Sequence, residues 1–270
     1  MTHSDVDREI ACVDSTEKKI DAFYKNRMRS LRSVDDIVAA LHGAVKAAGQ
    51  LDRTYFFFTS DHGLHMGQFC LGPCKRQPYD TDLRIPCLAV GPGIAPGPLA
   101  VVASIPDLAP TFLELCGAQA AIAELQMDGR SLMPLLRSTA RSASLSDRSV
   151  LLSAATDEAA PAWRTAHLVE YIATSGVVSH LDSSTHLKDN SNNTFIGLRI
   201  LNASMNLAYF EFTDATIDWA FADSNFCEMY DLAKDPHQLS NICSRSSPSL
   251  RAELHAQLWQ QYTCHGPTCN

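Results

Sequence analysis

The sequence predicts an α/β fold in its first half and a smaller, β-rich unit in its second half. Apolar residues recur at three- and four-residue steps from about Ser15 to Ala48, which is the period of a long amphipathic helix. An apolar strand, a loop, a second strand and a further helix follow, and this alternation is typical of α/β layering. Beyond about Ser138 short β-like runs are separated by turn-rich segments, as in an antiparallel subdomain.

The two strands predicted in the first half are continuously apolar. Thr54–Thr59 and Ile85–Gly93 lack the polar face of an edge strand, so we expect both to be buried, the first at the centre of a sheet covered on both faces. Residues 60–84, 25 in all, join them in a loop rich in glycine and proline, and connections of that length are often functional. A helix from about Asp107 to Cys116 follows, with Asp107 as its N-cap.

These patterns divide the chain into a partial α/β domain at residues 1–140 and a C-terminal β-rich unit at residues 141–270. A Ser-rich segment that starts at Ser138 is the expected linker. The runs predicted as strands in the second half are Val150–Leu152, His167–Tyr171, Thr194–Leu201, Leu207–Phe212 and Glu228–Leu232. A last helix is expected from about Ser249 to Tyr262.

Composition argues against several classes of protein. The formal net charge of -8 gives no attraction for a polyanion, so nucleic acid is not expected as a partner. No window of about 18 apolar residues occurs, so we expect no membrane span. The N-terminal residues are polar and charged, unlike a secretory signal peptide.

Two features favour secretion in spite of that N-terminus. Among the nine cysteines, Cys264 and Cys269 could close a small disulfide loop, which would imply an oxidising compartment. The alternative is that the cysteines are unpaired cytosolic thiols. Asn192 and Asn202 each begin an Asn-x-Ser/Thr sequon, so both are candidate glycosylation sites.

Asp61 and His62 lie at the carboxyl end of the first predicted strand, where open α/β sheets bind ligands. Asp61 can serve as an oxygen ligand or a base, and His62 can offer a ring nitrogen to a metal or a proton to a substrate. Gly63 permits the backbone bend that would turn both side chains toward one ion. The alternative is a surface turn in which Asp61 caps the loop, and spacing alone favours that turn.

A pair of cations stands further along the same loop, at Lys75 and Arg76. One interpretation is an anion clamp with Lys75 as a compact point charge, and the other is a solvated loop. Cations beside a metal pair in one loop suggest an anionic, oxygen-rich substrate such as a phosphate or sulfate ester.

The stretch "FFFTSDHGLHMGQFCLGPCKRQPYDTDLRIPCLAVGPGI" resembles the sulfatase family, most closely its N-acetylglucosamine-6-sulfatase branch. The segments "DLAPTFLELCG", "MDGRSLMPLL", "NNTFIGLRI" and "EMYDLAKDPHQLSNI" are similar to later segments of that branch, in the same order. The resemblance runs from about Asp21 to Cys269. It implies the C-terminal part of an alkaline-phosphatase-like sulfatase fold, with a smaller antiparallel β-rich C-terminal subdomain.

The resemblance also implies roles for residues of the loop. Asp61 and His62 match the family's second pair of calcium ligands, although His62 stands where other sulfatases place an asparagine. Lys75 matches the lysine that contacts the sulfate group. His65 and Gln68 fall in the same loop, and His65 is given a weaker substrate-side role. Ca²⁺ is thus the expected cofactor, and it takes 6–8 oxygen ligands in general.

For substrate and location, the resemblance implies 6-sulfated glucosamine in glycosaminoglycans such as heparan or keratan sulfate. It also implies a lysosomal or secreted glycoprotein, and the sequons agree with that location.

Two parts of the family's catalytic site are missing from this sequence. Its formylglycine nucleophile is made from the cysteine of Cys-x-Pro-x-Arg or Cys-x-Ala-x-Arg, and none of the nine cysteines stands in that pattern. The first metal-ligand pair, an Asp-Asp after an early strand, is also missing, because Asp35-Asp36 lies inside the predicted helix. The chain is therefore expected to be a fragment, or one of two parts, that is inactive alone and has the missing N-terminal half as a candidate partner.

Three hypotheses follow for function. The chain belongs to a glucosamine-6-sulfatase whose first half lies elsewhere, or it is a non-catalytic relative that binds sulfated glycans, or it is another hydrolase of the superfamily such as a phosphodiesterase. The similarity of its second half to glucosamine-6-sulfatases argues against the last of these.

Overall fold

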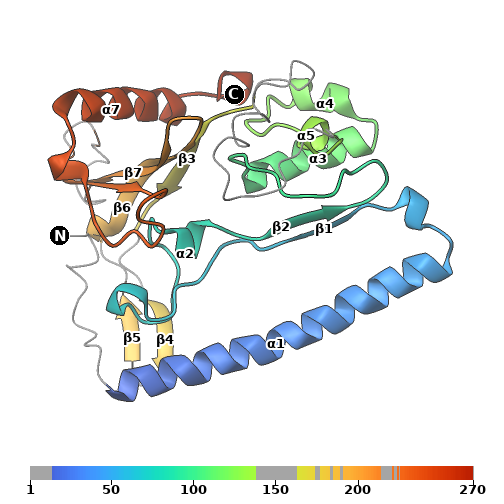
Figure 1. Ribbon diagram of the computed structural model, residues 1–270, viewed down its shortest axis with the longest axis horizontal. Coiled ribbons are helices and arrows are strands. Elements are labelled where there is room, and N and C mark those ends of the chain that lie inside the picture. Colours follow the sequence, from blue (N-terminus) through green and yellow to red (C-terminus); the bar gives the residue numbers. More distant parts are fainter. Residues whose placement is uncertain are drawn as a thin grey trace. The chain divides into compact units, whose positions relative to one another are not determined.

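The computed structural model describes residues 14–137, 163–173, 177–182, 185–188, 191–213, 221, 224 and 226–269 (Figure 1). The chain forms two compact units. Unit 1 comprises Met1–Pro92 with Ala173–Asn193, and unit 2 comprises Gly93–Ile172 with Thr194–Asn270. The predicted boundary between residues 140 and 141, the Ser-rich linker and the run Val150–Leu152 lie outside the described residues.

Unit 1 begins with the predicted helix. Helix α1 spans Asp14–Ala47 and is a single long rod in Figure 1. Gly49, with φ of +64°, lies just beyond its end, in the left-handed conformation that glycine adopts without strain. The apolar stripe of α1 is largely exposed, with 45% exposure at Phe23 and 57% at both Ile37 and Leu41. Such a stripe is what a helix normally buries against another layer.

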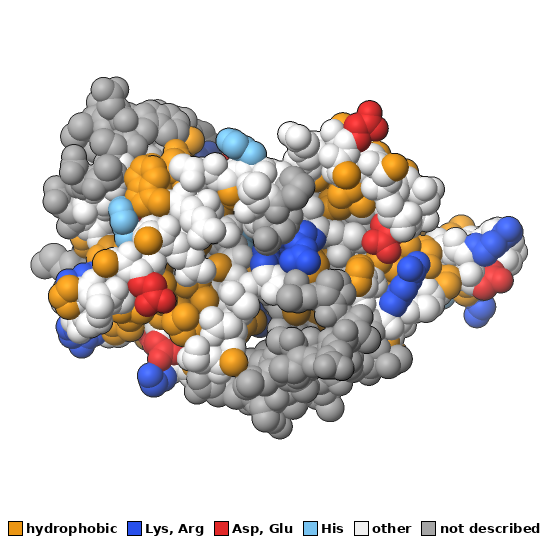
Figure 2. All heavy atoms as spheres, turned by 90° about the horizontal axis from the view of Figure 1, so that it is seen from above, with side chains coloured by type: hydrophobic (Ala, Val, Ile, Leu, Met, Phe, Trp, Pro, Cys, Tyr) orange, Lys and Arg blue, Asp and Glu red, His pale blue; other side chains and the backbone are white. Residues whose placement is uncertain are grey.

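The two strands of unit 1 pair with each other. Strand β1, Phe56–Thr59, runs antiparallel to β2, Cys87–Val90, in a register that places Phe56 opposite Val90. The existence of both strands is confirmed, but their expected burial is wrong, since Leu88 is 61% exposed and Val90 65%. The reason is that, among the described residues, each of these strands is hydrogen-bonded only to the other. Figure 2 shows hydrophobic side chains at the surface on the face seen there.

Unit 1 also contains a short helix and a hairpin. Helix α2, Asp80–Leu83, closes the long loop, and β4, Val177–Asp182, pairs with β5, Thr185–Lys188. The hairpin was not expected, because its strands alternate poorly between apolar and polar residues.

Unit 2 contains the antiparallel sheet that the second half predicts. Its strands are arranged in the order β3-β6-β7-β8, and every neighbouring pair is antiparallel. Helix α7 follows them and lies along the sheet in Figure 1. Among the described residues of unit 2, three short α-helices precede them. The bounds are α3 Leu108–Leu115, α4 Gln119–Glu124, α5 Met133–Arg137, β3 Ala166–Tyr171, β6 Thr194–Leu201, β7 Asn206–Thr213, β8 Phe226–Asp231 and α7 Pro248–Tyr262.

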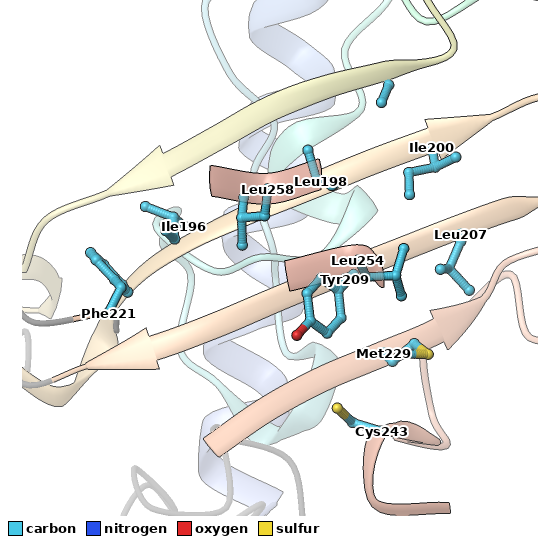
Figure 3. Close-up of a cluster of buried hydrophobic side chains, with 11 residues drawn as sticks. Ile196, Leu198, Ile200, Leu207, Tyr209, Phe221, Met229, Cys243, Leu254 and Leu258 are labelled. Atoms are coloured by element: carbon cyan, nitrogen blue, oxygen red, sulfur yellow. The ribbon is translucent and has the colours of Figure 1, made fainter. Parts of the chain in front are cut away.

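The core of unit 2 lies between this sheet and α7 (Figure 3). Alternate residues of the strands face the helix, as the two-residue period of a strand requires. Leu254 and Leu258 of α7 pack against side chains of β3, β6, β7 and β8. The buried cluster comprises Ala166, Ile196, Leu198, Ile200, Leu207, Tyr209, Phe221, Met229, Cys243, Leu254 and Leu258. A disulfide between Cys227 and Cys243 joins β8 to the segment before α7.

Asp107 is not the side-chain N-cap of α3. The carboxylate of this fully buried residue instead accepts hydrogen bonds from the backbone N–H groups of Ser104 and Arg130, both at 2.8 Å, and forms an ion pair with Arg164. The guanidinium carbons of Arg130 and Arg164 lie 5.0 and 5.1 Å from the ring centroid of Trp163. Its Nε1 donates to the Val102 carbonyl, so Trp163 is an anchor of the fold here.

A pH dependence of stability follows from His167, beside this ion pair. Burial, and then the positive charge of Arg164, lower the pKa of His167 from 6.5 to about 4, against the opposing effect of Asp107. Between these values the unfolded chain binds a proton that the folded chain does not, so stability falls as the pH drops. We expect a loss of up to about 3 kcal/mol between pH 7 and pH 4 from this residue.

Urea unfolding of the wild type and His167→Phe across this pH range measures that loss, with His237→Phe as the control. The wild type and the control are expected to lose stability more steeply than His167→Phe. Parallel pH profiles for His167→Phe and the wild type would contradict the prediction.

Candidate functional site

The loop of residues 60–84 is folded back on itself. His65 forms a two-way backbone bridge with Cys74, with N···O distances of 2.9 and 3.2 Å. Gly63 and Leu64 donate their N–H groups to the carbonyls of Asp82 and Thr81, at 2.7 and 2.9 Å. The predicted long loop is therefore an ordered unit, in which distant sequence positions are hydrogen-bonded to each other.

Gly63 has a different role from the one the sequence suggests. A Cβ atom at this position would overlap the Thr81 carbonyl and the Asp82 backbone. Glycine is thus needed for close approach of two backbone segments, and it is not among the residues of positive φ.

The loop brings together the three residues expected to bind a metal or sulfate. An Asp61 carboxylate oxygen lies 3.1 Å from Nε2 of His62, and Nζ of Lys75 contacts the same nitrogen. Nδ1 of His62 lies 2.7 Å from the Gly63 carbonyl, which can only accept a hydrogen bond. In the neutral tautomer with its hydrogen on Nδ1, Nε2 would be the ring nitrogen able to accept a hydrogen bond or to bind a metal ion.

The charges of the cluster favour an ionised Asp61. Desolvation acts to raise the pKa of Asp61, but the N–H of His62 and the charges of His62 and Lys75 lower it overall. The Asp61 side chain is 80% exposed, so its carboxylate faces solvent and is open to a ligand. A carboxylate oxygen and a ring nitrogen that lie this close together are donor types that divalent cations can take as ligands.

These two donors alone do not complete a metal site. The described residues contain no group of three or more His, Cys, Asp or Glu side chains arranged to hold a metal ion. Asp61 and His62 would therefore supply two ligands of a site whose other ligands come from elsewhere.

His65 is placed differently from Asp61 and Lys75. It is 2% exposed, and its Nδ1 lies 2.9 Å from both carboxylate oxygens of Asp82, which is 3% exposed. Asp82 also accepts the N–H of Gln77 at 2.8 Å. Sequence reasoning missed Asp82, because the separation between His65 and Asp82 matches no motif or period.

The remaining candidate residues belong to other segments of the chain. Asn192 is exposed, and Asn202 is partly exposed in the turn between β6 and β7, where its side-chain oxygen accepts the N–H groups of Ser204 and Met205. The structure joins Cys264 to Cys269 by a disulfide. Cys87 and Cys116 are free and exposed.

Comparison with known proteins decides which family contains such a loop. The sulfatase family model matches residues 2–118, which include the whole loop. Residues 2–118 therefore match a sulfatase domain. Members of this family are sulfuric ester hydrolases that generally bind a divalent metal.

The similarity to individual sulfatases extends over almost the whole chain. Human N-acetylglucosamine-6-sulfatase is 35% identical over an alignment 270 positions long. The alignment covers 95% of this chain and 44% of the human protein. An arylsulfatase of Volvox carteri is 30% identical and covers 93% of this chain and 36% of its own length. The chain thus spans less than half the length of these curated relatives.

The structural neighbours have the alkaline-phosphatase-like fold of sulfatases. A structure of BT4656 with its substrate D-glucosamine-2-N,6-O-disulfate has a TM-score of 0.58 at 23% identity, and covers 86% of this chain and 39% of that one. A phosphonate monoester hydrolase of Agrobacterium radiobacter has a TM-score of 0.54 at 21% identity, and covers 85% and 39%. The fold is therefore shared with other hydrolases, and the sequence comparison is what identifies the sulfatase family.

Two further findings bear on location. One relative, from Drosophila melanogaster, is an extracellular sulfatase homologue, 44% identical over 43% of this chain. Among the described residues, no helix has both the length and the apolar character that crossing a membrane requires.

Proposed function

We propose that this chain supplies one side of a sulfatase active site specific for 6-sulfated glucosamine, as found in heparan or keratan sulfate. The observation that supports the proposal most strongly is the convergence of Asp61, His62 and Lys75 within one ordered loop. In this proposal Asp61 and His62 are two ligands of a calcium ion, and Lys75 contacts the sulfate oxygens. When bound, the ion would stabilise negative charge on the transferring group.

Lys75 has the chemistry that this role needs. Its ammonium group is a compact charge that can approach a sulfate oxygen, and the neighbouring backbone bridge between His65 and Cys74 fixes the position of its main chain. Such sites lower the activation barrier mainly by holding positive charge near the oxygen atoms of the transferring group, where negative charge develops in the transition state.

The loop alone does not make a catalyst, because the chain has neither the formylglycine cysteine pattern nor the Asp-Asp pair. We therefore infer that the N-terminal half of a sulfatase domain is the partner of this chain, as an upstream segment of the same protein or as a separate polypeptide. The reading frame upstream of Met1 tests this. A frame that encodes both elements supports the enzyme, whereas non-coding sequence favours a relative that binds sulfated glycans without cleaving them.

Binding to a sulfated sugar is the direct test of the role of Lys75. We expect Lys75→Ala to weaken binding of N-acetylglucosamine 6-sulfate about tenfold, because one charge-assisted contact to the sulfate is lost. Isothermal titration calorimetry in the presence of Ca²⁺ measures the effect. Lys46→Ala removes an exposed lysine of α1 and serves as the control. Equal affinities of the wild type and Lys75→Ala would refute this role.

The proposed location is a lysosome or the extracellular space. It is supported by the disulfides Cys227–Cys243 and Cys264–Cys269, which need an oxidising compartment, and by the accessible Asn192 and Asn202. Glycosylation of both asparagines is part of this proposal.

A further inference from the structure

The carboxylate of Asp82 ties together separate parts of the loop. It accepts hydrogen bonds from Nδ1 of His65 and from the N–H of Gln77, while its backbone carbonyl accepts the N–H of Gly63. Both side chains of the pair are almost completely buried. A buried carboxylate must be hydrogen-bonded to be tolerated, and here its partners come from both sides of the loop.

The bonds to Asp82 enclose the segment that carries Lys75. His65 also pairs through its backbone with Cys74, the residue before Lys75, and Gln77 follows Lys75 by two positions. On the other side, Gly63 directly follows His62, the residue that Lys75 contacts. The Asp82–His65 pair therefore holds the loop segment that contains His65 and the segment that contains Gln77 at a fixed separation. That separation brings Lys75 close to Asp61 and His62.

We propose that His65 and Asp82 are a positioning pair, in which His65 acts through Nδ1 on Asp82 and does not contact the substrate. This inference rests on the proposed function, because it names what holds the sulfate-binding lysine against the metal-binding residues. A functional group must be held within about 0.5 Å of its working geometry, and this requires support from buried neighbours.

Two substitutions at His65 separate positioning from substrate contact. Asn can place an amide donor near the position of Nδ1, whereas the longer Gln reaches toward the position of Nε2. The positioning role predicts that His65→Asn keeps the bond to Asp82 and that His65→Gln loses it. A substrate contact through Nε2 predicts the reverse.

The first measurement is hydrogen–deuterium exchange of the full chain, resolved to single amides in the loop. We expect exchange at Gly63, Leu64 and Gln77 to be about tenfold faster in His65→Gln and Asp82→Asn than in the wild type, and nearly unchanged in His65→Asn. Asp52→Asn, an exposed carboxylate of unit 1, is the control and should leave these rates unchanged.

The second measurement is the affinity for inorganic sulfate. The dissociation constant is expected to rise about three- to tenfold in His65→Gln and Asp82→Asn and to stay within about twofold in His65→Asn, with melting temperatures similar for the two His65 variants. Any other order of the His65 variants, equality included, would overturn the positioning role. If the wild type binds no sulfate, the proposed function fails, and the exchange rates still decide whether the pair holds the loop.

Discussion

The purified 270-residue chain is expected to hydrolyse N-acetylglucosamine 6-sulfate no faster than its Lys75→Ala variant. Removing a catalytic nucleophile typically lowers turnover by roughly 10⁶-fold, and this chain has no cysteine in the pattern that gives the family its nucleophile. In the proposed site it would also supply only two metal ligands, Asp61 and His62. Release of sulfate from the sugar is measured by ion chromatography. Incubation over days lowers the smallest rate that the assay can detect.

The Lys75→Ala variant is the right reference for that assay, because it removes the proposed sulfate contact and leaves any contaminating sulfatase in place. Turnover by the wild type clearly above that reference would show that the chain carries a nucleophile of its own. It would also contradict the division of the active site between two halves.

The second large effect concerns solubility. Unit 1 exposes apolar side chains on α1 and on the β1–β2 pair, including Leu41, Leu88 and Val90 at 57%, 61% and 65%. Exposed apolar surface and unpaired strand edges promote association. We therefore expect the chain alone to self-associate increasingly as its concentration rises, and to be monodisperse when co-expressed with the N-terminal half of a glucosamine-6-sulfatase, as measured by size-exclusion chromatography with light scattering.

Polar substitution on β2 tests whether this surface is the cause. The double variant Leu88→Thr, Val90→Thr is expected to be more soluble alone and to bind the N-terminal half more weakly. Asp52→Asn, on the exposed turn before β1, should change neither property. A monodisperse wild-type monomer with a cooperative thermal unfolding transition would be evidence against the idea that the N-terminal half normally covers this surface.

The local patterns of the sequence predict most elements, because helix and strand periods depend on neighbouring residues. Helix α1, the strand β6 and the helix α7 lie within one or two residues of their predicted bounds. The burial of β1 and β2 was predicted wrongly, since an apolar run shows what a strand can bury and does not show which layers are present to cover it.

The candidate site divides in the same way. Asp61, His62 and Lys75 belong to a short, characteristic segment, and the structure places their side chains together, while their roles stay a prediction. The supporting bonds of Asp82 and the ion pair of Asp107 with Arg164 could not be predicted, because their partners are far apart in the sequence and only the fold brings them together.

The central claim is that Asp61, His62 and Lys75 form one side of a two-part sulfatase site. The measurement that tests it most directly is turnover of N-acetylglucosamine 6-sulfate by the chain combined with a polypeptide that carries the Cys-x-Pro-x-Arg and Asp-Asp segments. Activity is expected to appear on combination and to fall at least about 100-fold with Lys75→Ala, but to be unchanged by Lys46→Ala. A stable, active complex in which Lys75→Ala and Asp61→Asn turn over as fast as the wild type would contradict it.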